Sequence, residues 1–356
     1  MKRSSFFLTF VFFVSTLFAT TPEQLAAVDN QMLEKAKQFK DAIATSKGFR
    51  SGVYIYQKRS VSDYQQNPEK LAARLALLGF TDIYLGLNRW LNSGNRDEEK
   101  WLTAFNTTAH NFGMKVHVLT LSSSKLWVDN KRIYEDIKSV IDFNYTNKKE
   151  VRFDGISADL EPHIMKKGHV ERPKELLWEW HGTDNYGVGK DNDKLCERMV
   201  DVMARARKEM GKKLEFSQAQ GFFIQGRYDK GELSWGSAHQ MLKHVDQLIV
   251  MAYNYRPQRV LEMALPTLEN AKNFPRSVSV AVKTSLDTYG SEGPVTSFQP
   301  QGWDYMIDGI NFLVERASVY PSFRGIDVFE YQGLEKMWDG TAAADKRTNY
   351  EKTDNH

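Results

Sequence analysis

Short runs of apolar, β-branched and aromatic residues alternate along the chain with longer segments whose apolar residues recur at helical spacing. The short runs predict eight buried strands, at 52–56, 81–87, 115–121, 152–160, 214–217, 247–253, 277–282 and 325–329. Helical patterns lie between them, at 68–80, 98–113, 132–144, 193–211, 237–245, 260–273 and 303–318. Eight strands that alternate with helices over roughly 300 residues predict a (β/α)₈ barrel.

The same pattern predicts how the chain is divided. Residues 1–20 carry two cations and then an apolar run too short for a comfortable membrane span, which is the layout of a cleaved export signal. An N-terminal helix is expected within 21–48, the barrel over 49–340, and a polar tail over 341–356. The alternatives are an uncleaved N-terminal anchor and a doubly wound open sheet, although no strand is followed by the glycine-rich phosphate loop typical of such sheets.

Composition narrows the class of protein. Hydrophobic residues make up 41% of the chain and charged residues 26%, which argues against wholesale disorder and against a multi-span membrane protein. The 48 basic and 45 acidic residues are spread evenly, so no nucleic-acid partner is expected. A single cysteine, Cys196, excludes an internal disulfide framework and lies on an apolar helical face. We expect a secreted or periplasmic protein with no integral membrane domain after signal cleavage.

The fourth predicted strand carries the candidate chemistry. Because side chains alternate across a strand, Ile156, Ala158 and Leu160 share one face. The other face carries Ser157, Asp159 and, just beyond the strand, Glu161. If the apolar face packs on helices, two carboxylates point into the mouth of the barrel, and one of them should hold a proton near neutral pH. The alternative is an edge strand whose polar face meets water.

Two segments resemble one enzyme family. The segment DGISADLE at 154–161 resembles the DGxDxDxE signature of glycoside hydrolase family 18, the chitinases and endo-N-acetylglucosaminidases, which are (β/α)₈ barrels with this motif on strand four. The segment LIVMAYNY at 248–255 resembles the MxYD segment of the same family. Ser157 stands where the family has its middle aspartate, and Asn254 where it has the aspartate after the tyrosine.

The resemblance implies a role for each matching residue. Glu161 would protonate the glycosidic oxygen, and Asp159 would orient the acetamido group of the substrate, whose oxygen attacks the anomeric carbon. Tyr253 would hydrogen-bond that group, and Met251 would line the floor of the pocket. Such substrate-assisted hydrolysis needs no carboxylate nucleophile and no cofactor.

Further rim residues follow from their positions near the ends of the predicted strands. Amides and aromatic rings of this kind suit the hydroxyls and C–H faces of sugars. The remaining candidates for substrate binding are Tyr54, Tyr56, Asn88, His163, Gln218, Gln220, Tyr255, Arg256, Lys283, Glu330 and Tyr331. Trp178, Trp180 and His181, in the long connection after strand four, would form either a stacking platform or a small core of their own. His163, His169 and His181 match no standard zinc spacing, so no metal is expected.

The sequence therefore predicts an exported hydrolase of a β-linked glycan that contains N-acetylglucosamine. The predicted partner is an oligo- or polysaccharide substrate. Two alternatives remain open: a glycan-binding barrel without catalysis, motivated by Ser157 and Asn254, and a retaining glycosidase that uses Glu161 and Glu330 as its two carboxylates.

Overall fold

A closed barrel of eight parallel strands forms the centre of the molecule. We describe it from a computed structural model, which covers residues 20–56, 67–87, 96–181, 190–286 and 290–342. Each strand pairs with the next along the chain, and the eighth pairs with the first. The strands are β1 (Gly52–Tyr56), β2 (Asp82–Gly86), β3 (Lys115–Leu119), β4 (Gly155–Asp159), β5 (Glu215–Gly221), β6 (Gln247–Met251), β7 (Val278–Lys283) and β8 (Phe323–Phe329). The predicted (β/α)₈ barrel is confirmed.

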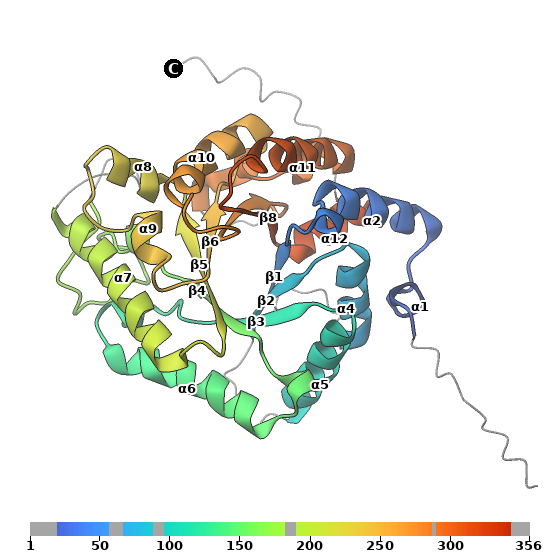
Figure 1. The fold of residues 1–356 in the computed structure, drawn as a ribbon, viewed down its shortest axis with the longest axis horizontal. Coiled ribbons are helices and arrows are strands. Elements are labelled where there is room, and N and C mark those ends of the chain that lie inside the picture. Colours follow the sequence, from blue (N-terminus) through green and yellow to red (C-terminus); the bar gives the residue numbers. More distant parts are fainter. Residues whose placement is uncertain (1–19, 57–66, 88–95, 182–189, 287–289, 343–356) are drawn as a thin grey trace, which may run out of the picture.

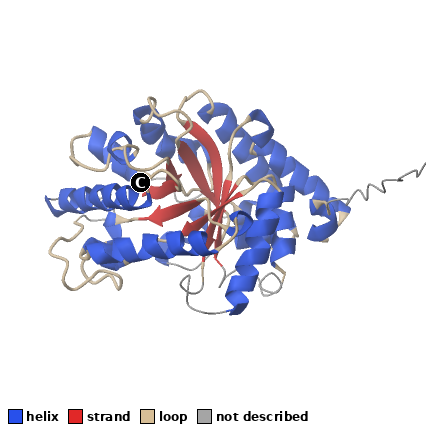
Figure 2. Ribbon diagram, turned by 60° about the horizontal axis from the view of Figure 1, so that its bottom comes forward, coloured by secondary structure: helices blue, strands red, loops and turns tan. Residues whose placement is uncertain are grey.

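Helices surround the strands on the outside, as Figures 1 and 2 show. The longer ones are α4 (Pro68–Leu77), α5 (Arg96–Asn111), α6 (Asn130–Thr146), α7 (Lys190–Met210), α10 (Pro257–Asn270) and α11 (Trp303–Ala317). Three further helices are short: α8 (Phe223–Asp229), α9 (Ala238–Met241) and α12 (Tyr331–Trp338). The sequence pattern missed α8 and α12, because each has no more than eight residues and contains a glycine that weakens the helical signal.

The N-terminal region differs from the single helix that the sequence predicted. It forms α1 (Pro22–Ala26) and α2 (Asn30–Ala42), followed by the 3₁₀ turn η1 (Thr45–Lys47). The break has a local cause. Ala27 ends α1 with a φ of 49°, and the carboxylate of Asp29 accepts a hydrogen bond from the backbone N–H of Met32 at 2.8 Å, which starts a new helix.

Helix α2 closes the ring by packing between α11 and α12. Phe39 is fully buried, and its ring lies 6.0 Å from that of Trp303. The indole N–H of Trp338 donates to the carbonyl of Met32 at 2.7 Å. The N-terminal segment is therefore an integral part of the barrel's outer layer.

The predicted export signal and most of the predicted polar tail lie outside the described residues. Within the described chain, no helix is long and apolar enough to cross a bilayer.

The molecule has two hydrophobic clusters, one between the strands and the helices and one inside the barrel. The larger fills the space between strands and helices and includes the outward residues of β4, namely Ile156 and Ala158, as well as Cys196. The smaller lies inside the barrel around Tyr54, Tyr84, Ile249 and Ala281, with further side chains packed on it at the carboxyl ends of the strands. Those ends form the mouth of the barrel, where (β/α)₈ enzymes keep their active sites.

Candidate active site

The DGISADLE segment divides into a structural start and a polar end. The carboxylate of Asp154 accepts a hydrogen bond from the backbone N–H of Val116 at 2.8 Å and lies 2.9 Å from Nε2 of His110, so it fastens β4 to β3. A Cβ atom on Gly155 would lie 2.3 Å from Nδ1 of His117 and 2.5 Å from the carbonyl oxygen of Glu215. Only glycine fits there, and these two residues therefore build the strand rather than take part in chemistry.

The next residues place two carboxyl groups at the mouth. Ser157, in the barrel interior, accepts a hydrogen bond from the hydroxyl of Ser217 at 2.9 Å. Asp159 follows two residues later on the same face, with its Oδ1 atom fully buried and without a hydrogen-bond donor among the described residues. The Glu161 side chain keeps a quarter of its surface exposed, so it can reach a bound substrate.

Burial changes the protonation of Asp159. It raises the pKa of this carboxyl to about 6, and the negative charge of Glu171 adds to the rise. The sequence predicted that one carboxyl on this face holds a proton, because two nearby carboxylates resist being desolvated and ionised together. In the structure the loss of water is the main cause, and the second carboxylate is Glu171, from the long connection after β4.

An aromatic floor adjoins the two carboxyl groups. The ring of Phe329, at the end of β8, lies 5.6 Å from that of Tyr54, 6.0 Å from that of Tyr56 and 5.5 Å from that of Tyr253. The ammonium group of Lys283, at the end of β7, lies 5.9 Å from the centre of the Tyr253 ring and 6.0 Å from that of Phe329. We call these five residues the mouth floor. Aromatic faces of this kind pack well against the C–H faces of a sugar ring.

Two tyrosines of the floor, Tyr54 and Tyr253, stay protonated. Burial raises the pKa of Tyr253 well above its ordinary value, and the charges of Asp159 and Glu161 contribute to the rise. The pKa of Tyr54 is raised by the same causes, burial first and Asp159 second. A phenol that keeps its proton is a hydrogen-bond donor. Tyr253 can therefore donate to an acceptor on a substrate beside Asp159 and Glu161.

His163 lies next to Glu161 as a neutral group. Its Nε2 atom is 3.6 Å from Oε1 of Glu161, and its ring stands perpendicular to that of Phe223 at 5.2 Å. Burial lowers the pKa of His163 to about 4, with the charges of Lys166 and His169 adding to the effect. At neutral pH the imidazole is uncharged, so it contacts Glu161 without forming an ion pair.

Residues after β6 form another part of the rim. Met251 ends the strand and is half-buried. The side-chain oxygen of Asn254 accepts a hydrogen bond from the backbone N–H of Arg256 at 2.9 Å, which makes a local turn. The guanidinium of Arg256 donates to the hydroxyl of Tyr255 at 2.9 Å and lies over its ring. Asn254 thus shapes this loop.

The structure does not bring every predicted residue to the mouth. Gln218 and Gln220 are buried and pair in register with Leu248 and Val250, whose side chains lie in the outer core. The amide of Gln218 donates to the carbonyl of Leu160 at 3.1 Å. The prediction placed both glutamines in a loop after β5, but the strand continues to Gly221, and alternation turns them away from Ser217 and the interior.

Three further residues predicted to bind substrate, Tyr331, Glu330 and Asn88, differ in where they lie. Tyr331 is buried in the outer core as the first residue of α12, not in the mouth floor. Glu330 is buried directly after Phe329, where its carbonyl oxygen accepts a hydrogen bond from the hydroxyl of Thr284 at 2.8 Å. Asn88 lies outside the described residues.

The long connection after β4 has its own packing. Trp180 is buried, with its ring 6.0 Å from that of Phe223, and Trp178 packs against the outer core. His181 is half-exposed, and its Nε2 atom lies 3.5 Å from the carboxylate of Asp191. Of the two interpretations that the sequence left open, these contacts favour a core of the connection's own over a stacking platform.

Sequence reasoning missed two residues of the site. Phe329 alternates with Asp327 along β8, so the period of a strand could have placed it inside the barrel. Glu171 acts on Asp159 from the long connection, and no local pattern could have revealed it.

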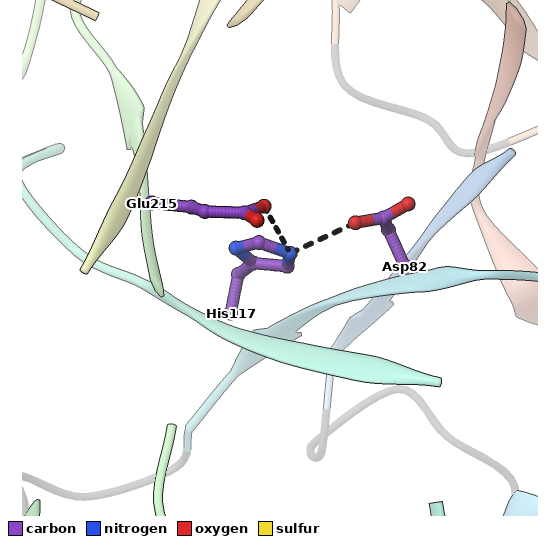
Figure 3. Close-up of side chains that lie close together, drawn as sticks. All are labelled: Asp82, His117 and Glu215. Atoms are coloured by element: carbon purple, nitrogen blue, oxygen red, sulfur yellow. Dashed lines mark hydrogen bonds and ion pairs between the residues drawn. The ribbon is translucent and has the colours of Figure 1, made fainter. Parts of the chain in front are cut away.

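A second polar cluster lies at the other end of the barrel, at the start of the strands. Asp82, His117 and Glu215 come close enough to share an ion: Nε2 of His117 lies 3.0 Å from Oδ1 of Asp82 and 4.0 Å from Oε2 of Glu215 (Figure 3). Three cations, however, already pair with these carboxylates, namely Arg50, Lys115 and Arg324. A metal ion would have to displace them, so we interpret the cluster as an ion-pair network that closes the barrel.

The pKa of Asp82 supports this interpretation. Burial by itself would raise the pKa of its carboxyl, but the hydrogen bond and charge of His117 and the charges of Arg50 and Arg324 outweigh it. The pKa therefore lies below its ordinary value, and Asp82 stays ionised within the network.

The raised pKa of Asp159 predicts a pH-dependent stability. The unfolded chain loses this proton near pH 4 and the folded chain near pH 6. Ionisation of Asp159 therefore lowers the free energy of unfolding as the pH rises from 4 to 6, and the loss is complete above pH 6. Asp159→Asn cannot ionise. We expect it to exceed the wild type in stability at pH 7.5 by on the order of 2 kcal/mol, and the gain to shrink toward pH 4.

Thermal unfolding at the two pH values measures this gain. The control Asp308→Asn removes an exposed carboxylate on α11, away from the mouth, and its gain in stability should be smaller than that of Asp159→Asn. A gain for Asp159→Asn that is equal at pH 4 and pH 7.5 would show that the carboxyl is not shifted by burial.

The chain is similar to known proteins in its fold but not in its sequence. No family model matches the chain, and no curated protein matches its sequence. The C-terminal domain of a candidate chitinase from Desulfitobacterium hafniense is similar in structure, with a TM-score of 0.50 and 12% identity over 82% of this chain and 97% of that domain. A glycoside hydrolase family 18 chitinase from Pseudoalteromonas aurantia gives a TM-score of 0.48 and 13% identity over 83% of this chain and 99% of that one. The chain thus has, in a divergent sequence, the barrel fold of chitinase structures.

Proposed function

We propose that this protein is a glycoside hydrolase that cleaves a β-linked glycan containing N-acetylglucosamine. One observation carries the proposal: Asp159 ends β4 and Glu161 follows two residues later, and Tyr253, two residues after the end of β6, lies within electrostatic reach of both. A buried carboxyl, a solvent-accessible carboxyl and a protonated phenol at one mouth are the groups that acid-catalysed cleavage of a sugar linkage needs.

In the proposed reaction Glu161, in its protonated form, donates its proton to the glycosidic oxygen as the bond from that oxygen to the anomeric carbon breaks. The oxygen of the substrate's acetamido group attacks the anomeric carbon from the other face and forms a cyclic oxazolinium ion. Water then opens this ion and gives its proton to the Glu161 carboxylate, which restores the acid. No protein nucleophile takes part.

The other groups hold the acetamido group in place. Tyr253 donates a hydrogen bond to the oxygen of the acetamido group, and the carboxyl of Asp159 accepts one from the N–H of the same group. The mouth floor packs against the sugar ring. Ser157 stands where the similar family has an aspartate, and it accepts a hydrogen bond from Ser217. Asp159 therefore has no second acid on this strand with which to share its proton.

Hydrolysis of chitotetraose tests the proposal, with cellotetraose as the matched substrate that lacks acetamido groups. We expect the wild type to cleave chitotetraose and to leave cellotetraose intact. Binding of chitotetraose without cleavage would identify a glycan-binding barrel instead.

Glu330→Gln separates the proposed route from a two-carboxylate glycosidase. In the substrate-assisted route this variant keeps its activity to within about tenfold, because Glu330 takes no part in bond making. If the variant were inactive and a 2-fluoro glycoside trapped a covalent glycosyl enzyme in the wild type, Glu330 would be the nucleophile.

A further inference from the structure

The end of the barrel opposite the mouth has a strong excess of positive charge. The connections that lead into the eight strands all meet at this end, because the strands are parallel. They span 48–51, 78–81, 112–114, 147–154, 211–214, 242–246, 271–277 and 318–322. Together they contain three acidic residues, Glu150, Asp154 and Asp246, and nine basic ones: Arg50, Lys148, Lys149, Arg152, Lys212, Lys213, Lys243, Lys272 and Arg276.

Two of the three acidic residues pair with neighbours outside these connections. Asp154 pairs with His110, and this hydrogen bond raises the pKa of the imidazole. Asp246 pairs with Arg207 of α7. Two of the three negative charges of this end are thus offset by neighbours outside the connections, which leaves Glu150 against the basic residues.

Eight of the nine basic residues are exposed; among them Arg152 donates to the carbonyl of Asn147, and Arg276 lies over the ring of Phe49. Arg50 belongs to the ion-pair network with Asp82 and Glu215. The other eight are all exposed, and none lies within ion-pair distance of a carboxylate of the described chain. We call these eight the basic end: Lys148, Lys149, Arg152, Lys212, Lys213, Lys243, Lys272 and Arg276. They come from the four consecutive connections into β4, β5, β6 and β7, so they form a patch over one side of this end of the barrel, with Glu150 and Asp246 within it.

Exposed apolar side chains flank this patch on both sides. Tyr145, in the last turn of α6 just before Lys148, is 87% exposed. Val319, in the connection into β8, is 73% exposed, and that connection is joined to Arg276, whose backbone N–H donates to the carbonyl of Pro321 at 2.9 Å. By contrast, the described part of the connection after β4 at the mouth, residues 160–181, carries four basic and four acidic residues.

We propose that the basic end binds the surface of a bilayer that contains anionic phospholipid. Each exposed lysine or arginine near such a surface contributes about 1 kcal/mol, and flanking apolar side chains add to this by entering the headgroup region. The cations sit on short connections spread over one end of the barrel, an arrangement suited to an extended surface. Because the mouth lies at the opposite end, a protein bound this way presents its mouth away from the bilayer.

Sedimentation of the full chain with vesicles tests the proposal. We expect the wild type to bind vesicles of phosphatidylglycerol and phosphatidylcholine at low salt, to be released at high salt, and to ignore vesicles of phosphatidylcholine alone. The test variant replaces Lys148, Lys149, Lys212 and Lys213 by Glu. Its partition coefficient should fall at least about a hundredfold.

A second variant controls for net charge. Replacing Lys37, Lys100, Lys125 and Lys230 by Glu changes the total charge equally, at exposed positions outside the basic end. This control should bind the anionic vesicles within about threefold of the wild type. Both variants keep the apolar segment 6–18, so any contribution of that segment cancels.

Three outcomes would overturn the proposal. The first is an equal loss of binding in both variants, which would assign the effect to net charge. The second is wild-type binding to vesicles of phosphatidylcholine alone at the same level. The third is retention on a soluble anionic polysaccharide without binding to anionic vesicles, which would identify a polymer partner in place of a bilayer.

Discussion

Replacing Glu161 by Gln is expected to lower kcat on chitotetraose by about 10²- to 10⁴-fold, the usual contribution of a general acid. Glutamine has the same size and keeps the contact with His163, but it has no proton to give to the leaving oxygen. KM should change little, because the mouth floor and Tyr253 still bind the sugar. The unfolding temperature should stay close to that of the wild type, since a quarter of the Glu161 side chain is exposed.

A matched variant in the same connection controls for charge. Glu175→Gln removes an exposed carboxylate from the loop after β4 and should keep full activity. If Glu161→Gln retained more than a tenth of the wild-type kcat, Glu161 would not be the acid, even if the protein were a hydrolase.

Replacing Gly325 by Ala is expected to lower the free energy of unfolding by about 4 kcal/mol or more, which is at the upper end for a single substitution. Gly325 has a φ of 152°, and a Cβ atom there would lie 1.7 Å from the carbonyl oxygen of Arg50. That oxygen is backbone, so it cannot turn aside. The start of β1 would have to move away from β8, where the barrel closes.

Urea unfolding measures this loss, with Gly226→Ala as the control. Gly226 lies in α8, and a Cβ atom there would meet nothing within 4 Å. The control should change stability by no more than about 1 kcal/mol, in the stabilising direction, because alanine favours a helix. Equal effects of the two substitutions would contradict the close approach of β8 to Arg50.

The sequence predicted the barrel because its strands and helices differ strongly in the period of their apolar residues. It also predicted the inner face of β4, since Ile156, Ala158 and Leu160 leave only one direction for Asp159 and Glu161. The structure confirms the barrel and places Ile156, Ala158 and Leu160 in the outer core, as the alternation predicted.

The errors arose where a strand's end was uncertain. The prediction ended the fifth strand at Ser217 because the polar Gln218 follows, and it therefore placed two glutamines in a mouth loop. The structure continues β5 to Gly221, which turns Gln218 and Gln220 outward. Phe329 was missed for a related reason: the polar residues Glu330 and Tyr331 follow it directly and were the candidates at the end of β8.

Other features depend on contacts between distant parts of the chain. The effect of Glu171 on Asp159 needs the path of the long connection after β4. The ion-pair network needs the register of four strands, since Asp82 pairs with Lys115 and Gly155 with Glu215 across the sheet. The basic end appears only when connections from four parts of the chain are brought to one end of the barrel.

The stereochemistry of the first product tests the proposed mechanism most directly. Attack by the acetamido oxygen and then by water inverts the anomeric carbon twice, so the wild type should release the β-anomer from chitotetraose before mutarotation. Proton NMR within the first minutes of reaction measures this. First-formed α-anomer, or equal cleavage of cellotetraose, would contradict substrate-assisted catalysis at Asp159, Glu161 and Tyr253.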